Sequence, residues 1–225
     1  RFASAGARAV AVADLQEDAL QGVVDEIGGL AVACDVSNEA QIRNLVERVE
    51  KELGPIDIFC SNAGIARWGD EDAPNEEWQS NFDIHVMAHV YAVRAVAPKM
   101  VERGGGYFIH TASAAGLLSH IRSATYSVSK HAAVAFAEWV AIKYQGDGIR
   151  VSVLAPQAVR TAMTTGPTGN SIGSFDGMIE AETLADWVLD SMAKEELLIL
   201  PPPEGRKYLA NKRTEIGRWV RGMSS

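Results

Sequence analysis

The feature that most constrains this chain is an alternation of short apolar runs with longer amphipathic stretches along its whole length. This alternation is typical of a parallel sheet covered by helices on both faces, because the connection between parallel strands usually contains a helix. Six runs bounded by Gly, Pro, Asp or Asn are predicted strands: Arg8–Asp14, Leu30–Cys34, Ile56–Ser61, Tyr107–Ala112, Arg150–Ala155 and Leu197–Leu200. We therefore predict a single doubly wound α/β domain over residues 1–225.

Three of the intervening stretches are predicted helices with informative patterns. The helix Asn38–Leu53 opens with residues at capping-box spacing and closes at Gly54-Pro55, a stop signal. The helices His85–Glu102 and Tyr126–Tyr144 are apolar around much of their circumference, whereas a helix packed only on its own sheet has one apolar stripe. We expect the last two helices to form the interface of a homodimer or homotetramer; the alternative is that they are well-covered interior helices.

Charge and cysteine content exclude several classes of protein. The net charge of -8 opposes binding to nucleic acid or to anionic lipid, since both are held largely by Lys and Arg. No apolar run approaches the roughly 20 residues that span a bilayer. Cys34 and Cys60 lie in predicted buried strands, which suits reduced thiols in a cytoplasmic protein better than disulfides.

Two stretches near the carboxyl end have more than one interpretation. Residues Thr164–Ser174 are too rich in Gly, Thr and Ser for a regular element, and we interpret them as a lid over an active site or as an ordinary surface loop. Basic residues within Glu204–Arg221 alternate with apolar ones. This spacing predicts an amphipathic helix with a solvated basic face, the alternative being a site for an anionic substrate or partner.

The strongest local motif is Tyr126-Ser127-Val128-Ser129-Lys130, at the start of a predicted helix. The i, i+4 spacing puts the phenol and the ammonium on one face, about 5 to 6 Å apart at Cβ. A tyrosine needs a nearby positive charge to act as a base at neutral pH, and Lys130 supplies one. Ser113 follows the predicted strand Tyr107–Ala112, at the edge of the sheet where α/β proteins bind ligands.

With these residues in order, the chain resembles the short-chain dehydrogenase/reductase family over essentially its whole length. The family's catalytic Ser, Tyr and Lys match Ser113, Tyr126 and Lys130. Its cofactor-lining elements match the following residues: Asp35 and Val36 in Cys34-Asp35-Val36, then Asn62, Ala63 and Gly64, then Pro156, Val159 and Thr161. The resemblance implies a Rossmann-like fold and a nicotinamide cofactor that Tyr126 and Lys130 also contact. It further implies that Ser113 binds the substrate oxygen, Tyr126 moves the proton, and Lys130 holds the nicotinamide ribose while lowering the pKa of Tyr126.

The end of the first predicted strand indicates which nicotinamide cofactor is used. Asp14 ends that strand, and an acidic side chain there accepts hydrogen bonds from the adenine ribose and repels a 2′-phosphate. We therefore predict NAD as the cofactor, with Asp14 and Leu15 on its adenosine side. Asp14 can at the same time cap the helix segment that begins at Leu15.

The chain departs from the family first in its phosphate-binding loop. The glycine-rich turn expected about 20 residues before Asp14 is absent, and residues Arg1–Gly6 look like the end of the helix that follows that turn. The family's first strand lies between the strands that here end at Asp14 and Ser61. We therefore expect two unpaired strand edges in this chain, and a further strand and glycine loop upstream in the natural protein.

Single-residue departures also bear on activity. His85 stands where the family usually has an Asn that holds a water linked to the active-site Lys; it could relay protons near neutral pH, or mark weakened catalysis. His85 and His89 form an i, i+4 pair, but position 86 is Val and no third ligand is evident, so we predict no metal site. Gln157 replaces the family's usual Gly after Pro156, beside the nicotinamide pocket.

The leading interpretation is an NAD(H)-dependent oxidoreductase that interconverts a secondary alcohol and a ketone. The main alternative is a catalytically weak relative with a nucleotide-sensing or scaffolding role; another chemistry on the same fold, such as dehydration, is a third. Three segments are expected to shape the substrate pocket: 66–73, 117–122 and 164–178. They carry no fixed charge aimed at an obvious ligand group, so we expect a neutral, moderately apolar alcohol or ketone.

Overall fold

A computed structural model describes residues 1–165 and 176–224 of the chain. Its strands are β1 (Ala11–Asp14), β2 (Leu30–Ala33), β3 (Ile58–Ser61), β4 (Gly106–Thr111), β5 (Ile149–Leu154) and β6 (Leu198–Ile199). Its helices are α1 (Glu17–Ile27), α2 (Glu39–Leu53), α3 (Asn75–Phe82), α4 (Ala88–Glu102), α5 (Ala115–Leu118), α6 (Ala124–Tyr144), α7 (Ala162–Thr165), α8 (Ala181–Ala193), α9 (Glu204–Thr214) and α10 (Ile216–Met223). A π-helical turn, Asp83–Met87, leads into α4, and a 3₁₀ turn, Gln145–Asp147, follows α6. All six predicted strands are present, with ends shifted by up to three residues.

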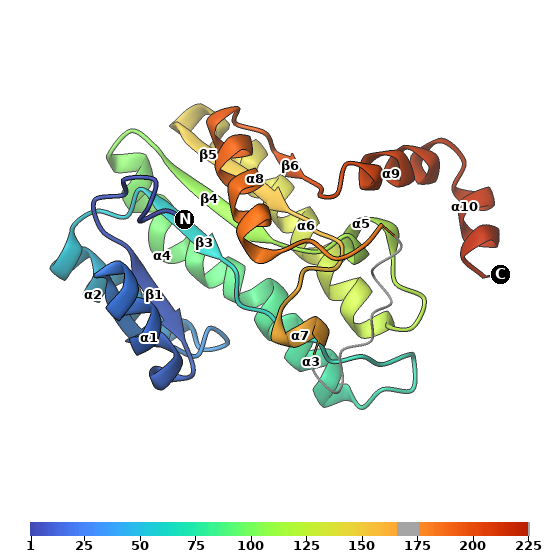
Figure 1. The fold of residues 1–225 in the computed structure, drawn as a ribbon, viewed down its shortest axis with the longest axis horizontal. Coiled ribbons are helices and arrows are strands. Elements are labelled where there is room, and N and C mark those ends of the chain that lie inside the picture. Colours follow the sequence, from blue (N-terminus) through green and yellow to red (C-terminus); the bar gives the residue numbers. More distant parts are fainter. Residues whose placement is uncertain (166–175, 225) are drawn as a thin grey trace.

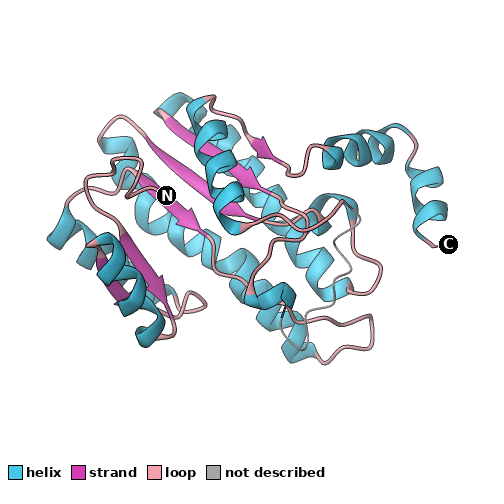
Figure 2. Ribbon diagram, in the orientation of Figure 1, coloured by secondary structure: helices cyan, strands magenta, loops and turns pink. Residues whose placement is uncertain are grey.

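The strands are all parallel and carry helices on both faces (Figures 1 and 2). On one face, α4 and α6 pack on β3 to β5 through a large core that includes Val96, Met100, Phe108 and Val140. On the other face, Leu184 and Val188 of α8 pack against Ile109. The predicted doubly wound α/β architecture is therefore confirmed.

The strands fall into two groups in the part of the chain that the structure describes. β1 pairs with β2, while β3, β4, β5 and β6 form a second sheet in that order. β1 and β3 therefore each present an edge that is not hydrogen-bonded to the other, and the expectation of two unpaired edges is confirmed. Residues 1–7 form a hydrogen-bonded turn beside β3, in which the Ala5 N–H donates to the Arg1 carbonyl (2.8 Å) (Figure 1).

The predicted boundaries of α2 hold in detail. The Asn38 side chain accepts hydrogen bonds from the N–H groups of Ala40 and Gln41, and Gly54, at φ +94°, ends the helix. The capping box is incomplete, because the Gln41 side chain accepts from the Asp35 N–H rather than from the helix cap. Its carbonyl oxygen therefore ties the helix to the end of β2.

Two other predictions are wrong. The single amphipathic helix expected over 204–221 is two helices, α9 and α10, separated at Glu215, whose backbone is not helical (φ -147°, ψ 71°). Cys60, expected to be buried, is exposed, because its edge of β3 has no neighbouring strand among the described residues. Cys34 is buried as expected, and both thiols are free.

Candidate active site

Tyr126, Ser113 and Lys130 come together at the carboxyl ends of β4 and β5. Ser113 follows β4, while Tyr126 and Lys130 lie on the first turns of α6, which Ser123 caps by accepting from the Tyr126 N–H (3.2 Å). Burial raises the pKa of Tyr126, and a hydrogen bond with Ser113 acts in the opposite direction. The Ser113 oxygen also accepts from the Ala115 N–H (3.1 Å), which orients the hydroxyl. The structure therefore places the predicted serine close to the predicted tyrosine.

Lys130 is buried beside the phenol, with 3% of its surface exposed. Its Nζ lies 5.7 Å from the centroid of the Tyr126 ring and donates to the carbonyl oxygen of Thr111 (3.1 Å). Burial lowers the pKa of Lys130 to about 7. The pKa of Tyr126 is nevertheless raised, because desolvation of the phenol is the largest effect on it, and the lowering of this pKa by Lys130 stays a prediction.

His85 lies in the π-helical turn before α4 and is completely buried. Its ring meets the Tyr126 ring edge-on, with 5.3 Å between centroids. Burial and the neighbouring charge of Lys130 lower the pKa of His85 to about 3. The expectation that His85 carries a proton near neutral pH therefore does not hold in this structure, and the imidazole is neutral.

The neutral His85 ring links the loop after β3 to the catalytic helix in either tautomer. When Nε2 accepts from the Ile65 N–H (3.2 Å), Nδ1–H donates to Ser129 Oγ (2.9 Å), and that hydroxyl donates to the Tyr126 carbonyl (3.0 Å). In the other tautomer, Nε2–H donates to the Ile65 carbonyl (3.1 Å) and Nδ1 accepts from Ser129. His85 thus fixes the position of the turn that carries Tyr126.

The Asn62-Ala63-Gly64 segment lies directly against this cluster. The Asn62 side-chain oxygen accepts from the Thr111 hydroxyl (3.1 Å), so Thr111 contacts Asn62 through its side chain and Lys130 through its carbonyl. A Cβ at Gly64 would lie 3.6 Å from His85 Nε2 and 3.7 Å from Lys130 Nζ. Sequence analysis did not identify Thr111 as a site residue, because its contact with Lys130 is made by a backbone atom that leaves no mark in the sequence.

The predicted adenosine-side residues lie at the ends of β1 and β2. Asp14 is exposed at the end of β1, and its carboxylate accepts from the Gln16 N–H (3.0 Å), one residue before α1 begins. It therefore braces the turn before α1, while its other oxygen faces solvent or a ligand. Leu15 is exposed. Asp35 accepts more hydrogen bonds than Asp14, because one of its oxygens accepts from both the N–H and the hydroxyl of Ser37 (2.9 and 2.7 Å).

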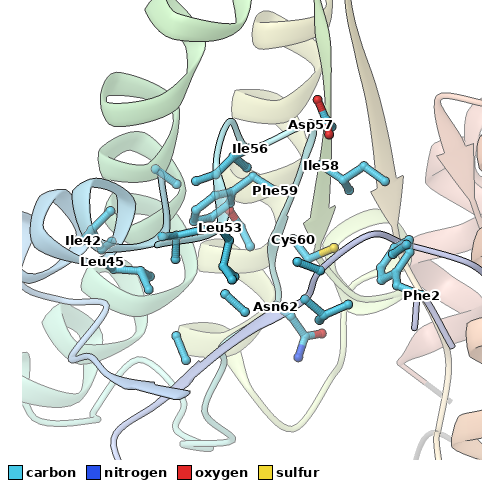
Figure 3. A pocket seen from close by; sticks show the side chains of 18 of the residues that line it. Phe2, Ile42, Leu45, Leu53, Ile56, Asp57, Ile58, Phe59, Cys60 and Asn62 are labelled. Atoms are coloured by element: carbon cyan, nitrogen blue, oxygen red, sulfur yellow. The ribbon is translucent and has the colours of Figure 1, made fainter. Parts of the chain in front are cut away.

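A cavity of about 430 Å³, here called the β1–β3 cavity, separates the two groups of strands (Figure 3). Most of its lining is apolar and comes from α2, β3 and the start of the chain. Its lining includes four predicted cofactor residues: Asp14, Val36, Asn62 and Ala63. Ser113, Tyr126 and Lys130 are not among the described residues that line it. The cavity occupies the place that the family resemblance assigns to the first strand.

The segment after β5 is held by backbone and side-chain contacts. The Pro156 carbonyl accepts from the Ala114 N–H (2.9 Å), and Val159 pairs with Ile179. Thr161 caps α7, its carbonyl accepting from the N–H groups at 164 and 165 (3.0 Å each). Of the expected lid Thr164–Ser174, Thr164 and Thr165 belong to α7, and 166–174 lie outside the described residues.

Gln157, a departure from the family, has a side-chain partner. Its amide donates to Asp176 (3.0 Å), whose other oxygen accepts from the Tyr208 hydroxyl (2.9 Å). This bridge ties the end of β5 to α9. Sequence analysis missed Asp176 and Tyr208, since neither lies in a recognisable motif.

The described residues fit a dinucleotide at two of its three parts. Asp14 offers an exposed carboxylate for ribose hydroxyls, and Lys130, Asn62 and Tyr126 offer polar groups where a nicotinamide ribose would lie. For the pyrophosphate, the glycine-rich turn expected about 20 residues before Asp14 is not among the described residues. Among the described residues, no three His, Cys, Asp or Glu side chains are grouped to hold a metal ion. Within the same residues, no helix is long and apolar enough to cross a membrane.

Comparison with known proteins agrees with this geometry. A family model described as short chain dehydrogenase matches residues 1–169. The chain is 32% identical over 232 residues to 1-deoxy-11-beta-hydroxypentalenate dehydrogenase of Streptomyces exfoliatus, covering 98% of this chain and 83% of the relative.

Solved structures share the fold. A short chain dehydrogenase/reductase from Burkholderia phymatum in complex with NAD has a TM-score of 0.84 at 24% identity, covering 92% of this chain and 84% of that one. L-sorbose reductase from Gluconobacter frateurii, complexed with NADPH and L-sorbose, has a TM-score of 0.73 at 25% identity, covering 84% of each chain. The chain therefore belongs to the short-chain dehydrogenase family of oxidoreductases.

Proposed function

We propose that this protein is an NAD(H)-dependent oxidoreductase that interconverts a secondary alcohol and a ketone, with Tyr126 as the general acid and base. The observation that carries the proposal is the buried Lys130 side chain, whose Nζ lies 5.7 Å from the centroid of the Tyr126 ring, with Ser113 near enough to that phenol to lower its pKa. These groups lie at the carboxyl ends of parallel strands, where ligands of such sheets bind.

Each side chain has a defined task in this proposal. In reduction, the Ser113 hydroxyl donates a hydrogen bond to the ketone oxygen, and Tyr126 donates its proton to that oxygen as the alcohol forms. In oxidation, the Tyr126 phenolate takes the alcohol proton. The bound nicotinamide supplies the hydride in reduction and accepts it in oxidation. Lys130 donates to the nicotinamide ribose, and the raised pKa of Tyr126 keeps its proton available for reduction.

The preference for NAD over NADP rests on Asp14. Its carboxylate is exposed at the end of β1, and among the described residues only one of its oxygens accepts a hydrogen bond, so it can accept hydrogen bonds from ribose hydroxyls and repel a 2′-phosphate. Related structures contain either cofactor, NAD in the Burkholderia protein and NADPH in L-sorbose reductase. The fold alone therefore does not distinguish NAD from NADP, and the proposal of NAD depends on Asp14.

Three further properties belong to the same proposal. The substrate is a neutral, moderately apolar alcohol or ketone, since the segments expected to shape the pocket carry no fixed charge aimed at an obvious ligand group. The protein assembles as a homodimer or homotetramer through α4 and α6, where Ile142 is 76% exposed in the single chain. It works in the cytoplasm, where its two free thiols stay reduced.

Loss of nicotinamide absorbance on adding a ketone tests the function. Wild-type protein is expected to oxidise NADH with cyclohexanone at a higher kcat/KM than NADPH, and Tyr126→Phe is expected to lose this activity while still binding NADH. NADH binding without turnover of any ketone or alcohol by wild type would contradict the proposal.

A further inference from the structure

A row of aromatic side chains borders Tyr126. Trp68, in the loop after β3, lies with its ring centroid 5.1 Å from that of Tyr126 and 5.1 Å from that of His120, which follows α5. The two ring pairs are tilted at 42° and 41°, so the three rings form a continuous bent surface. We call Trp68 and His120 the aromatic wall.

The wall differs from the other neighbours of Tyr126 in its access to solvent. His85 and Lys130 pack against the same phenol, but both are buried. Trp68 is 37% exposed. A substrate whose oxygen reaches the Tyr126 hydroxyl from solvent therefore has the indole of Trp68 beside it.

The backbone on both sides of Trp68 is fixed to the start of α6. The Arg67 carbonyl accepts from the Thr125 hydroxyl (3.1 Å), and the Gly69 carbonyl accepts from the Ala124 N–H (2.8 Å). A Cβ at Gly69 would lie 2.5 Å from Ala73 Cβ, so this turn is tightly packed. The indole is therefore held near Tyr126 before any substrate arrives, which reduces the entropy cost of binding.

The surroundings of the wall favour an apolar ligand. Burial and the nearby Arg122 lower the pKa of His120, which favours the neutral form of its ring. Ile121, the next residue, is 70% exposed and extends the apolar surface. An indole face, a neutral imidazole and an aliphatic side chain gain most from a flat hydrocarbon face and little from a chain of hydroxyl groups.

We infer that Trp68 is a specificity-determining residue and that the preferred substrate is a ring-containing, largely apolar secondary alcohol or ketone whose ring face lies on the indole. An acyclic ketone of similar reactivity leaves the indole uncovered and gains less from it. This inference rests on the proposed function for the reacting oxygen, but not for the binding of the ring.

Two ketones and two variants test it. NADH-dependent reduction of 2-decalone, a fused bicyclic ketone, is compared with reduction of butan-2-one in wild type, Trp68→Leu and Trp68→Phe. Trp68→Leu is expected to lower kcat/KM for 2-decalone roughly tenfold through KM, with a much smaller change for butan-2-one, and Trp68→Phe is expected to retain most of the wild-type value. Calorimetric titration with 2-decalone in the presence of NAD⁺, which cannot reduce the ketone, is expected to show the same loss of affinity in Trp68→Leu.

The outcomes separate the two proposals. Equal losses for both ketones, or no loss for either, would overturn the role of Trp68 while leaving the oxidoreductase function in place. Calorimetric binding of 2-decalone that depends on Trp68, without reduction of either ketone, would support the wall and contradict the proposed function. Neither binding nor reduction of 2-decalone by wild type would overturn the wall as a substrate surface.

Discussion

The two ends of the candidate dinucleotide site are built very differently. At the catalytic end, Lys130 and His85 are buried and their side-chain nitrogens have partners within the chain, Thr111 for Lys130 and Ile65 and Ser129 for His85. At the adenosine end, Asp14 is exposed, and the β1–β3 cavity separates β1 from the main sheet.

This difference divides catalysis from cofactor recognition. The catalytic groups are positioned by β4 and α6, which share one large core, and by the turn before α4, whose His85 bonds to Ser129 of α6. The adenosine-side groups depend on a two-stranded sheet that contacts the rest through α2 and α4. We therefore expect substitutions at the catalytic end to change chemistry and stability together, and substitutions at the adenosine end to change cofactor choice alone.

The largest effect is expected for Tyr126→Phe. Removing the phenolic hydroxyl leaves the ring packing intact but removes the proton donor, so kcat for ketone reduction should fall by about 10²- to 10⁴-fold. Affinity for NADH, measured by fluorescence titration, should change little. A variant that keeps more than a tenth of the wild-type kcat would show that another group moves the proton.

Lys130→Met should lower activity strongly and raise stability. The folded-state pKa of about 7 lies below the ordinary value of 10.5, so the unfolded chain binds more protons between these pH values. The burial penalty is therefore complete below about pH 7 and disappears as the pH rises towards 10.5. Urea unfolding without cofactor should show Lys130→Met to be more stable than wild type at pH 6, by on the order of several kcal/mol, with the gap closing at high pH. A constant gap across this range would contradict the assignment.

His85→Ala should lower activity less than Tyr126→Phe or Lys130→Met does, and it should also lower the free energy of unfolding. It leaves the buried Ile65 and Ser129 groups without their partner, which should lower the free energy of unfolding by about 1 to 3 kcal/mol and kcat/KM by roughly tenfold. Because the His85 ring is neutral above about pH 3, the breaks in the pH profile of kcat should stay where they are in wild type. His85→Asn, which keeps a donor and an acceptor, is the matched control and should recover part of the loss. A break near neutral pH that disappears in His85→Asn would show that this ring titrates during turnover.

The smallest effect is expected at the adenosine end. Asp14→Asn removes an exposed charge, so the ratio of kcat/KM for NADH to that for NADPH should fall by roughly tenfold or less, and more at low than at high salt. Unfolding midpoint and kcat with saturating NADH should be unchanged. A large loss of stability in this variant would contradict the claim that substitutions at the adenosine end change cofactor choice alone.

Much of this site could be predicted from the sequence, because it depends on local order. Strand ends, the Tyr126 to Lys130 spacing and the Asn62-Ala63-Gly64 turn follow from short-range patterns, and the structure places them together. Contacts made by backbone atoms or between distant segments could not be predicted, as with the Thr111 carbonyl on Lys130 and the Gln157 to Asp176 bridge.

The pKa values of the site residues also could not be predicted from the sequence. The presence of a lysine four residues after Tyr126 predicts a lowered phenol pKa, but the pKa depends on how deeply both groups are buried, and here burial is the larger effect. The same holds for His85, whose neutral state follows from the side chains packed around it. Burial of this kind is a property of the complete fold.

Transfer of deuterium from the nicotinamide to the product tests the central claim most directly. Wild-type protein is incubated with a panel of cyclic and acyclic ketones and NADH deuterated at C4, and the alcohol formed is examined by mass spectrometry and NMR. We predict one deuterium on the carbinol carbon of at least one product, and a rate at least about 10²-fold lower with Tyr126→Phe. Tight binding of NADH with no deuterated alcohol from any ketone would contradict the account and indicate a relative that binds the nucleotide without catalysing its oxidation.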